Sequence, residues 1–146
     1  MDSLRIERVR DSFVHVLFDP DRASRLFYDR LFELAPATRD LFTHDIAVQG
    51  RVLIESIATI VTGLARFDAM RPTLAALAIR HAGYGVTPDH YPIVGQALLD
   101  MMERVCGDFD MDTRKAWADA YTLISDAMIA AAYPGITPSA VPATRD

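Results

Sequence analysis

The chain has 146 residues, of which 51% are hydrophobic and 24% charged, and its formal net charge at pH 7 is -5. This length and apolar content suit one domain around one core, and the acidic balance with scattered Lys and Arg argues against a nucleic-acid partner. The only cysteine, Cys106, allows no intramolecular disulfide, and no stretch resembles a secretion signal or an apolar run that could span a bilayer. We therefore expect a cytoplasmic protein without a membrane partner.

Apolar residues recur at helical spacing along most of the chain. The segments that show this pattern span residues 3–18, 21–34, 46–65, 72–81, 88–105 and 111–133, with short turns between 35 and 42. Pro72 and Pro88 are placed in the first turn of their helices, and Thr87 is placed as the N-cap of the second. No alternating strand pattern occurs, so the prediction is an all-α domain of six to eight helices. It covers residues 1–133, and residues 134–146 are expected to form a flexible tail.

The stretch from Ile79 to Gly95 reads IRHAGYGVTPDHYPIVG and contains the candidate functional residues of most interest. His81 closes an apolar helix there, and His90 opens the next helix together with Tyr91. A lone histidine at a helix end is more often a structural residue than a metal ligand. The helical pattern is also compatible with a plain bundle that binds no ligand, so periodicity alone leaves both interpretations open.

Four sequence blocks resemble those of the bacterial globins, specifically single-domain haemoglobins and the haem domain of flavohaemoglobins. In chain order they are Phe27-Tyr28 through Leu31-Phe32, Pro36 with Leu41-Phe42, His81 followed by Gly85-Val86 and His90-Tyr91-Pro92-Ile93-Val94-Gly95, and Ala116-Trp117 with Ala120-Tyr121. The resemblance implies a globin fold around a haem pocket. It also implies haem b, iron protoporphyrin IX, as the cofactor.

The resemblance also implies the residues on either side of the haem iron. His81 is similar to the proximal ligand, which binds the iron through Nε2. Tyr28 and Gln49 resemble the distal hydrogen-bond donors, and a donor aimed at bound oxygen contributes about 1.5 to 3 kcal/mol. That contribution slows the release of oxygen. The alternatives are a core aromatic at Tyr28 and an ordinary helical residue at Gln49, and His90 is interpreted as a structural or hydrogen-bonding residue.

The other cofactor-binding residues that the resemblance implies are mostly apolar. They are Phe42, Leu53, Leu77, Val86, Tyr91 and Val94. Phe42 is similar to the phenylalanine that packs flat against the haem in this family, and Leu53 would present an apolar wall to the gas ligand. An interpretation of the apolar members as ordinary core holds in any case, since a haem is itself a large apolar neighbour.

The chain departs from its relatives on the proximal side. In the relatives a tyrosine at the position of Tyr91 joins the proximal histidine and a glutamate of the last helix in a polar network. Here the glutamate position is occupied by Ala132, and no acid lies in the last turn before Tyr133. We expect the basicity of His81 to rest on Tyr91 and on the backbone carbonyl near Leu77, without strong peroxidase-like activation.

The resemblance implies a haemoglobin that binds oxygen reversibly and also takes nitric oxide and carbon monoxide, as a monomer or a homodimer. Flavohaemoglobins continue into a reductase, whereas only a short segment follows Tyr133 here and no GxGxxG motif occurs. Electrons are therefore expected from a separate reductase, with which the protein could act as a nitric oxide dioxygenase that forms nitrate. Two alternatives stay open: a haem-based gas sensor that acts through a separate partner protein, and a globin that has lost haem.

Overall fold

The structure is a computed structural model, and it describes residues 1–42 and 45–135. Within this part every regular element is helical. The elements are α1 (Ser3–Phe18), α2 (Pro20–Leu34), η1 (Pro36–Leu41), α3 (Ile46–Gly63), η2 (Leu64–Arg66), α4 (Phe67–Gly83), α5 (His90–Val105) and α6 (Met111–Ala132). The all-α prediction is confirmed. Of the predicted flexible tail, residues 136–146 lie outside the described residues.

Aspartate side chains begin four of the six α-helices. Their carboxylates accept hydrogen bonds of 2.8 to 3.1 Å from backbone N–H groups that have no partner within the helix. The capping residues are Asp2, Asp19, Asp45 and Asp110. A side-chain cap of this kind stabilises a helix by about 1 kcal/mol. The cap at Asp19 lets α2 begin at Pro20, one residue before the predicted start, because proline fits the first helical position.

The predicted start of the fourth helix at Pro72 is wrong, since α4 begins at Phe67 and contains Pro72 in its interior. Proline lacks the N–H that would bond to the carbonyl of Asp68, but so near the helix start this removes a single intrahelical bond. The gain is apolar burial, because Met70 is buried and its side chain lies against Gly63 at the end of α3. Packing therefore extends α4 past the proline.

The predicted start of the fifth helix at Pro88 is also wrong, by two residues. The chain first makes a tight turn in which the N–H of His90 bonds to the carbonyl of Thr87 at 3.0 Å and that of Tyr91 to Pro88 at 3.2 Å. The N–H of Thr87 donates to Nδ1 of His90 at 2.9 Å, which closes the turn before α5. Thr87 thus marks the turn and not the helix start, and His90 makes a structural hydrogen bond.

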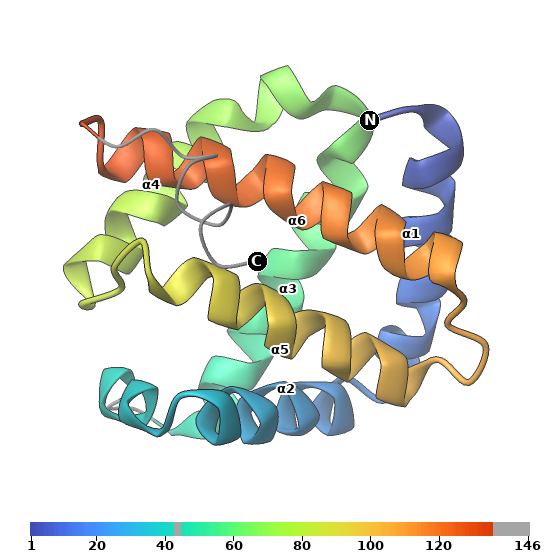
Figure 1. The fold of residues 1–146 in the computed structure, drawn as a ribbon, viewed down its shortest axis with the longest axis horizontal. Coiled ribbons are helices and arrows are strands. Elements are labelled where there is room, and N and C mark those ends of the chain that lie inside the picture. Colours follow the sequence, from blue (N-terminus) through green and yellow to red (C-terminus); the bar gives the residue numbers. More distant parts are fainter. Residues whose placement is uncertain (43–44, 136–146) are drawn as a thin grey trace.

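The helices pack so that α5 lies between α2 and α6, while α4 and α1 pack against α6 and α3 packs against α2 (Figure 1). One core runs through the molecule. Fully buried side chains from five helices form its centre, among them Val9, Leu31, Leu74, Met101 and Ile129. An ion pair of 2.7 Å between Arg30 and Asp100 joins α2 to α5 at the surface.

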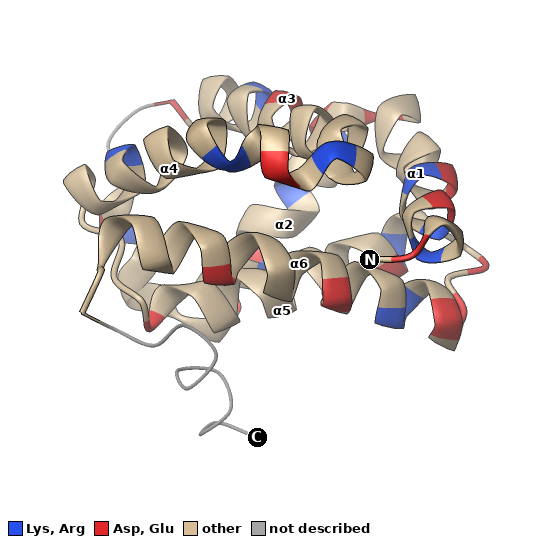
Figure 2. Ribbon diagram, turned by 90° about the horizontal axis from the view of Figure 1, so that it is seen from above, with Lys and Arg blue, Asp and Glu red and all other residues tan. Residues whose placement is uncertain are grey.

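Charged side chains are scattered over the helices, with both signs interspersed (Figure 2). In the part of the chain that the structure describes, no helix is both long enough and apolar enough to cross a membrane.

Gly95 allows the close approach of α5 and α6. A Cβ atom at this position would lie 2.6 Å from Cε2 of Tyr121, whose hydroxyl donates to the carbonyl of Tyr91 at 2.6 Å and so holds the ring in place. Replacing Gly95 by alanine is therefore expected to lower the free energy of unfolding by about 1 to 3 kcal/mol. Urea unfolding measures it. Gly107→Ala is the matched control, because a Cβ there meets no atom within 4 Å, and equal stability of the two variants would contradict the prediction.

Candidate functional site

Tyr28 lies on α2 inside a cluster of aromatic rings. Its ring meets that of Phe42 edge-on at a centroid distance of 5.1 Å and stacks on that of Phe32 at 6.0 Å. Burial raises the pKa of Tyr28 to about 12, with no hydrogen bond or nearby charge contributing to the shift. The hydroxyl therefore remains protonated at neutral pH and is available as a donor. The structure brings together two of the predicted site residues here, Tyr28 and Phe42.

Gln49 lies in the first turn of α3, which packs closely on α2. A Cβ atom on the neighbouring Gly50 would lie 2.6 Å from Oγ of Ser24 and 4.0 Å from Cε2 of Tyr28. The Oε1 atom of Gln49 is buried and has no partner among the described residues. A half-turn of the amide would present the Nε2 donor in its place. One helical turn later Leu53 is half-buried and packs on the core.

His81 lies near the end of α4 and is half-buried. Burial lowers the pKa of its imidazole, the nearby carbonyl of Leu77 opposes this shift, and the charge of Arg80 adds to it. Although the Leu77 carbonyl influences the ring, Nδ1 has no hydrogen-bond partner of full geometry among the described residues. The neutral imidazole is thus the favoured form, and it is the form that binds metals.

The backbone after His81 is fixed by a Schellman motif. The N–H of Gly85 bonds to the carbonyl of Ala82 at 3.1 Å, and that of Val86 to the carbonyl of His81 at 3.0 Å. Gly85 has a φ of 102°, and a Cβ there would lie 3.3 Å from Cδ2 of Leu41. The turn after His81 therefore lies against the segment that ends in Phe42, which links the two halves of the predicted site.

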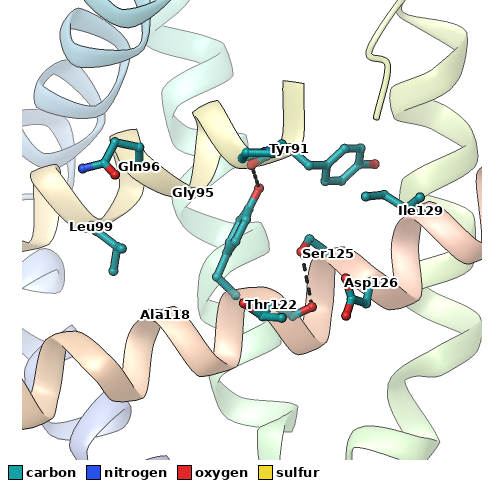
Figure 3. A pocket seen from close by; sticks show the side chains of 11 residues that line it. Tyr91, Gly95, Gln96, Leu99, Ala118, Thr122, Ser125, Asp126 and Ile129 are labelled. Carbon is teal, nitrogen blue, oxygen red and sulfur yellow. Dashed lines mark hydrogen bonds between the residues drawn. The ribbon is translucent and has the colours of Figure 1, made fainter. Parts of the chain in front are cut away.

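Tyr91 is buried in the first turn of α5. Its carbonyl accepts the hydrogen bond from Tyr121, and Figure 3 shows its ring pointing toward Ile129 of α6. Its hydroxyl is buried without a partner among the described residues. Burial, together with the nearby Tyr133, raises the pKa of Tyr91 to about 12. The sequence predicts no carboxylate at the position of Ala132 that could reach Tyr91, and in the described part of the chain this hydroxyl is unpaired.

Tyr133 is a site residue that the sequence analysis missed. Its hydroxyl donates a hydrogen bond to the backbone carbonyl of Val86, in the turn that follows His81. The only signal in the sequence is that Tyr133, directly after the end of α6, carries a hydrogen-bonding side chain, whereas Ala130, Ala131 and Ala132 before it carry none. The partner is a backbone atom far away in the chain, which no motif indicates.

The predicted apolar residues share one property. Each packs on the core yet remains partly accessible, and they come from five different segments of the chain: Phe42, Leu53, Leu77, Val86 and Val94. Partly accessible apolar side chains around a few polar groups are typical of a cofactor-binding surface.

Buried polar atoms without a hydrogen-bond partner provide a test of whether these residues fit a haem. The buried side-chain atoms without a partner among the described residues are Oε1 of Gln49, Nδ1 of His81, the hydroxyl of Tyr91 and Oδ1 of Asp126. Such atoms are rare in folded proteins because each costs free energy, and they point to function. Three of the four belong to residues predicted to surround haem. A neutral imidazole, hydrogen-bonding side chains and apolar neighbours are the groups that a haem site requires.

A cavity of about 290 Å³ lies elsewhere, between α5 and α6 (Figure 3). Its walls include Tyr91, Gly95, Tyr121 and Asp126, but not His81 or the residues around Tyr28. The hydroxyls of Tyr121 and Ser125 are already bonded to backbone carbonyls there. Of the predicted site residues, only Tyr91 lines this cavity.

Asp126 provides a test of electrostatics in this cavity. Burial raises the pKa of its carboxyl, so ionising this group in the folded protein is unfavourable at neutral pH and the penalty disappears as the pH falls through the folded pKa. Asp126→Asn is expected to be more stable than the parent at pH 7, with a gain that shrinks as the pH falls toward about 4. Urea unfolding at both pH values measures it. Asp29→Asn is the control, because Asp29 is exposed. A loss of stability at pH 7 in Asp126→Asn would contradict the prediction.

Comparisons with known proteins identify the family of this chain. A family model described as Globin matches residues 25–128. The flavohemoprotein of Halalkalibacterium halodurans is 35% identical over 107 residues, which cover 70% of this chain and 26% of that protein. The flavohemoprotein of Bacillus subtilis is 27% identical over 133 residues, covering 88% and 33%. The chain thus spans about a quarter to a third of the length of these relatives.

A solved structure gives the same result for the fold. The bacterial globin from Campylobacter jejuni matches with a TM-score of 0.80 at 25% sequence identity, covering 91% of this chain and 97% of that chain. The region matched by the family model includes Tyr28, Gln49, His81 and Tyr91 and ends before Tyr133. On these grounds the chain belongs to the globin family, and its helices form a globin fold.

Proposed function

We propose that this protein is a bacterial haemoglobin that holds haem b through Nε2 of His81 and binds oxygen reversibly. The observation that carries the proposal is the half-buried His81, whose Nδ1 has no hydrogen-bond partner among the described residues, in a chain of the globin family. When bound, haem supplies an iron centre that takes up diatomic gases and exchanges electrons with them.

On the proximal side the protein holds the imidazole and keeps it neutral. The carbonyl of Leu77 acts on the ring from one turn earlier in α4, and the Schellman motif fixes the backbone carbonyl of His81. Groups that accept a hydrogen bond from a ligating histidine orient its ring and raise its basicity. Since Ala132 supplies no carboxylate, basicity rests on weaker groups than in relatives that carry the glutamate. This supports reversible binding over peroxidase-like activation.

On the distal side Tyr28 and Gln49 would donate hydrogen bonds to the gas ligand. The hydroxyl of Tyr28 remains protonated at neutral pH and lies in the aromatic cluster next to Phe42. A donor to a ligand that gains negative charge contributes about 1.5 to 3 kcal/mol, or about ten- to hundred-fold in affinity. Slow release of oxygen suits scavenging or chemistry on oxygen better than rapid delivery.

Nitric oxide is the proposed second substrate. Oxygen taken up by the ferrous protein would oxidise it to nitrate, and a separate reductase would supply the one electron that returns the resulting ferric protein to the ferrous state. The likeness to proteins named flavohemoprotein supports this, and the Globin family model covers the segments that carry Tyr28, His81 and Tyr91. We place the reaction in the cytoplasm, which the free thiol of Cys106 supports. Rapid mixing of the oxygen-saturated ferrous protein with nitric oxide tests the proposal. Stoichiometric nitrate within the mixing time is expected. Slow oxidation would contradict the proposed dioxygenase activity and leave the proposal of oxygen binding unaffected.

A further inference from the structure

Two hydrogen bonds connect the end of α6 with the backbone of His81. The hydroxyl of Tyr133 donates to the carbonyl of Val86, and the N–H of Val86 donates to the carbonyl of His81 at 3.0 Å. Both bonds pass through one residue, Val86, which is the last member of the Schellman motif. A movement of the Tyr133 side chain would therefore be transmitted to the turn that fixes His81.

Contacts at the end of α6 hold Tyr133 in place. Its backbone N–H donates to the carbonyl of Ile129 at 2.8 Å and ends α6, and its ring is half-buried against the core. Helix α6 in turn packs along α4, the helix that carries His81 (Figure 1). The hydroxyl of Tyr133 is thus fixed by the body of the fold and not by the loop it contacts.

The turn that Tyr133 contacts has little other support on its outer side. Tyr84, Gly85 and Thr87 are exposed, whereas Val86 is half-buried. The hydrogen bond to the Val86 carbonyl therefore restrains a segment whose neighbouring side chains remain largely in solvent.

We propose that Tyr133 is a positioning residue for the His81 imidazole, acting through the carbonyl of Val86. Ala132 offers no hydrogen-bonding side chain, and the hydroxyl of the next residue, Tyr133, holds the backbone after His81. The inference rests on the proposed function, because the orientation of His81 matters only if His81 holds haem.

The test compares Tyr133→Phe with the parent protein, in which only the hydroxyl is removed. In the haem-free protein, hydrogen exchange at the amide of Val86 is expected to accelerate about three- to ten-fold, because the Schellman motif opens more often. In the haem-loaded ferrous protein, the iron–histidine stretching band in resonance Raman spectra is expected to shift. The rate of haem loss to a competing apoprotein should rise together with it.

Two variants serve as controls. Tyr84→Phe removes a hydroxyl from an exposed tyrosine in the same turn, and Ser12→Ala removes the acceptor of the 2.7 Å bond from Nε1 of Trp117. Ser12 lies on α1, which packs near the opposite end of α6 (Figure 1). Ser12→Ala is therefore expected to lower the stability of the protein without changing a contact of the turn after His81. Neither control is expected to move the iron–histidine band.

The outcomes separate the inference from the function on which it rests. A parent protein that takes up no haem would contradict the proposed function. Haem uptake by the parent with an unchanged iron–histidine band in Tyr133→Phe would overturn the role of Tyr133, even if exchange at Val86 became faster. An equal band shift in Ser12→Ala would overturn it too, because the effect would then reflect general loss of stability.

Discussion

Replacing His81 by glycine is expected to lower the affinity of the protein for haem by more than about 100-fold. At metal sites, the loss of a group that only hydrogen-bonds to a ligand already lowers metal affinity by about 10- to 100-fold. The variant loses the imidazole that burial keeps neutral at the end of α4. Titration of the haem-free protein with haemin, followed by absorbance in the Soret region, measures the change.

Added imidazole separates the loss of a ligand from a loss of folding in this experiment. The His81→Gly substitution leaves a space of the size of the missing side chain, so free imidazole should restore haem uptake to a folded variant. His90→Ala is the matched control, since His90 bonds to the backbone of Thr87 and is expected to leave haem affinity within a few fold. Haem uptake by His81→Gly equal to that of the parent would show that another residue holds the iron.

Replacing Tyr28 by phenylalanine is expected to accelerate oxygen dissociation by about 10- to 100-fold, which corresponds to the loss of about 1.5 to 3 kcal/mol. The ring that packs against Phe42 and Phe32 remains, so the fold is retained and only the donor disappears. Stopped-flow displacement of oxygen by carbon monoxide measures the rate.

The matched control for this prediction is Tyr84→Phe, whose hydroxyl lies on a side chain that is 68% exposed. Its dissociation rate should equal that of the parent. If Tyr28→Phe also releases oxygen at the parent rate, Tyr28 is a core aromatic without a distal role, and Gln49 becomes the remaining candidate donor.

The helical pattern predicted the fold well where a single local signal dominates. Apolar residues at helical spacing predicted α1 and α6 almost to the residue, and the structure adds the aspartate caps Asp2 and Asp110 at their starts. The errors arose where packing opposes a local rule. At Pro72 the burial of Met70 outweighs one lost hydrogen bond, and at Thr87 a tight turn uses the capping groups before the helix begins.

The candidate site could be predicted from sequence only as a set of residues. The resemblance indicated Tyr28, His81 and Tyr91 because these positions lie in blocks of fixed spacing. It could not indicate Tyr133, whose acceptor is the carbonyl of Val86, because a backbone atom leaves no trace in the sequence and is brought near only by the packing of α6 on α4. The orientation of the Gln49 amide likewise depends on the placement of α3 against α2.

The most direct test of this account is a spectroscopic titration of the purified, haem-free protein with haemin, completed by reduction and exposure to oxygen. The account predicts a strong Soret band that saturates at one haem for each chain, and a reversible spectral change when the reduced protein meets oxygen. A protein that remains colourless after reconstitution would contradict it, and with it the assignment of His81 as the haem ligand.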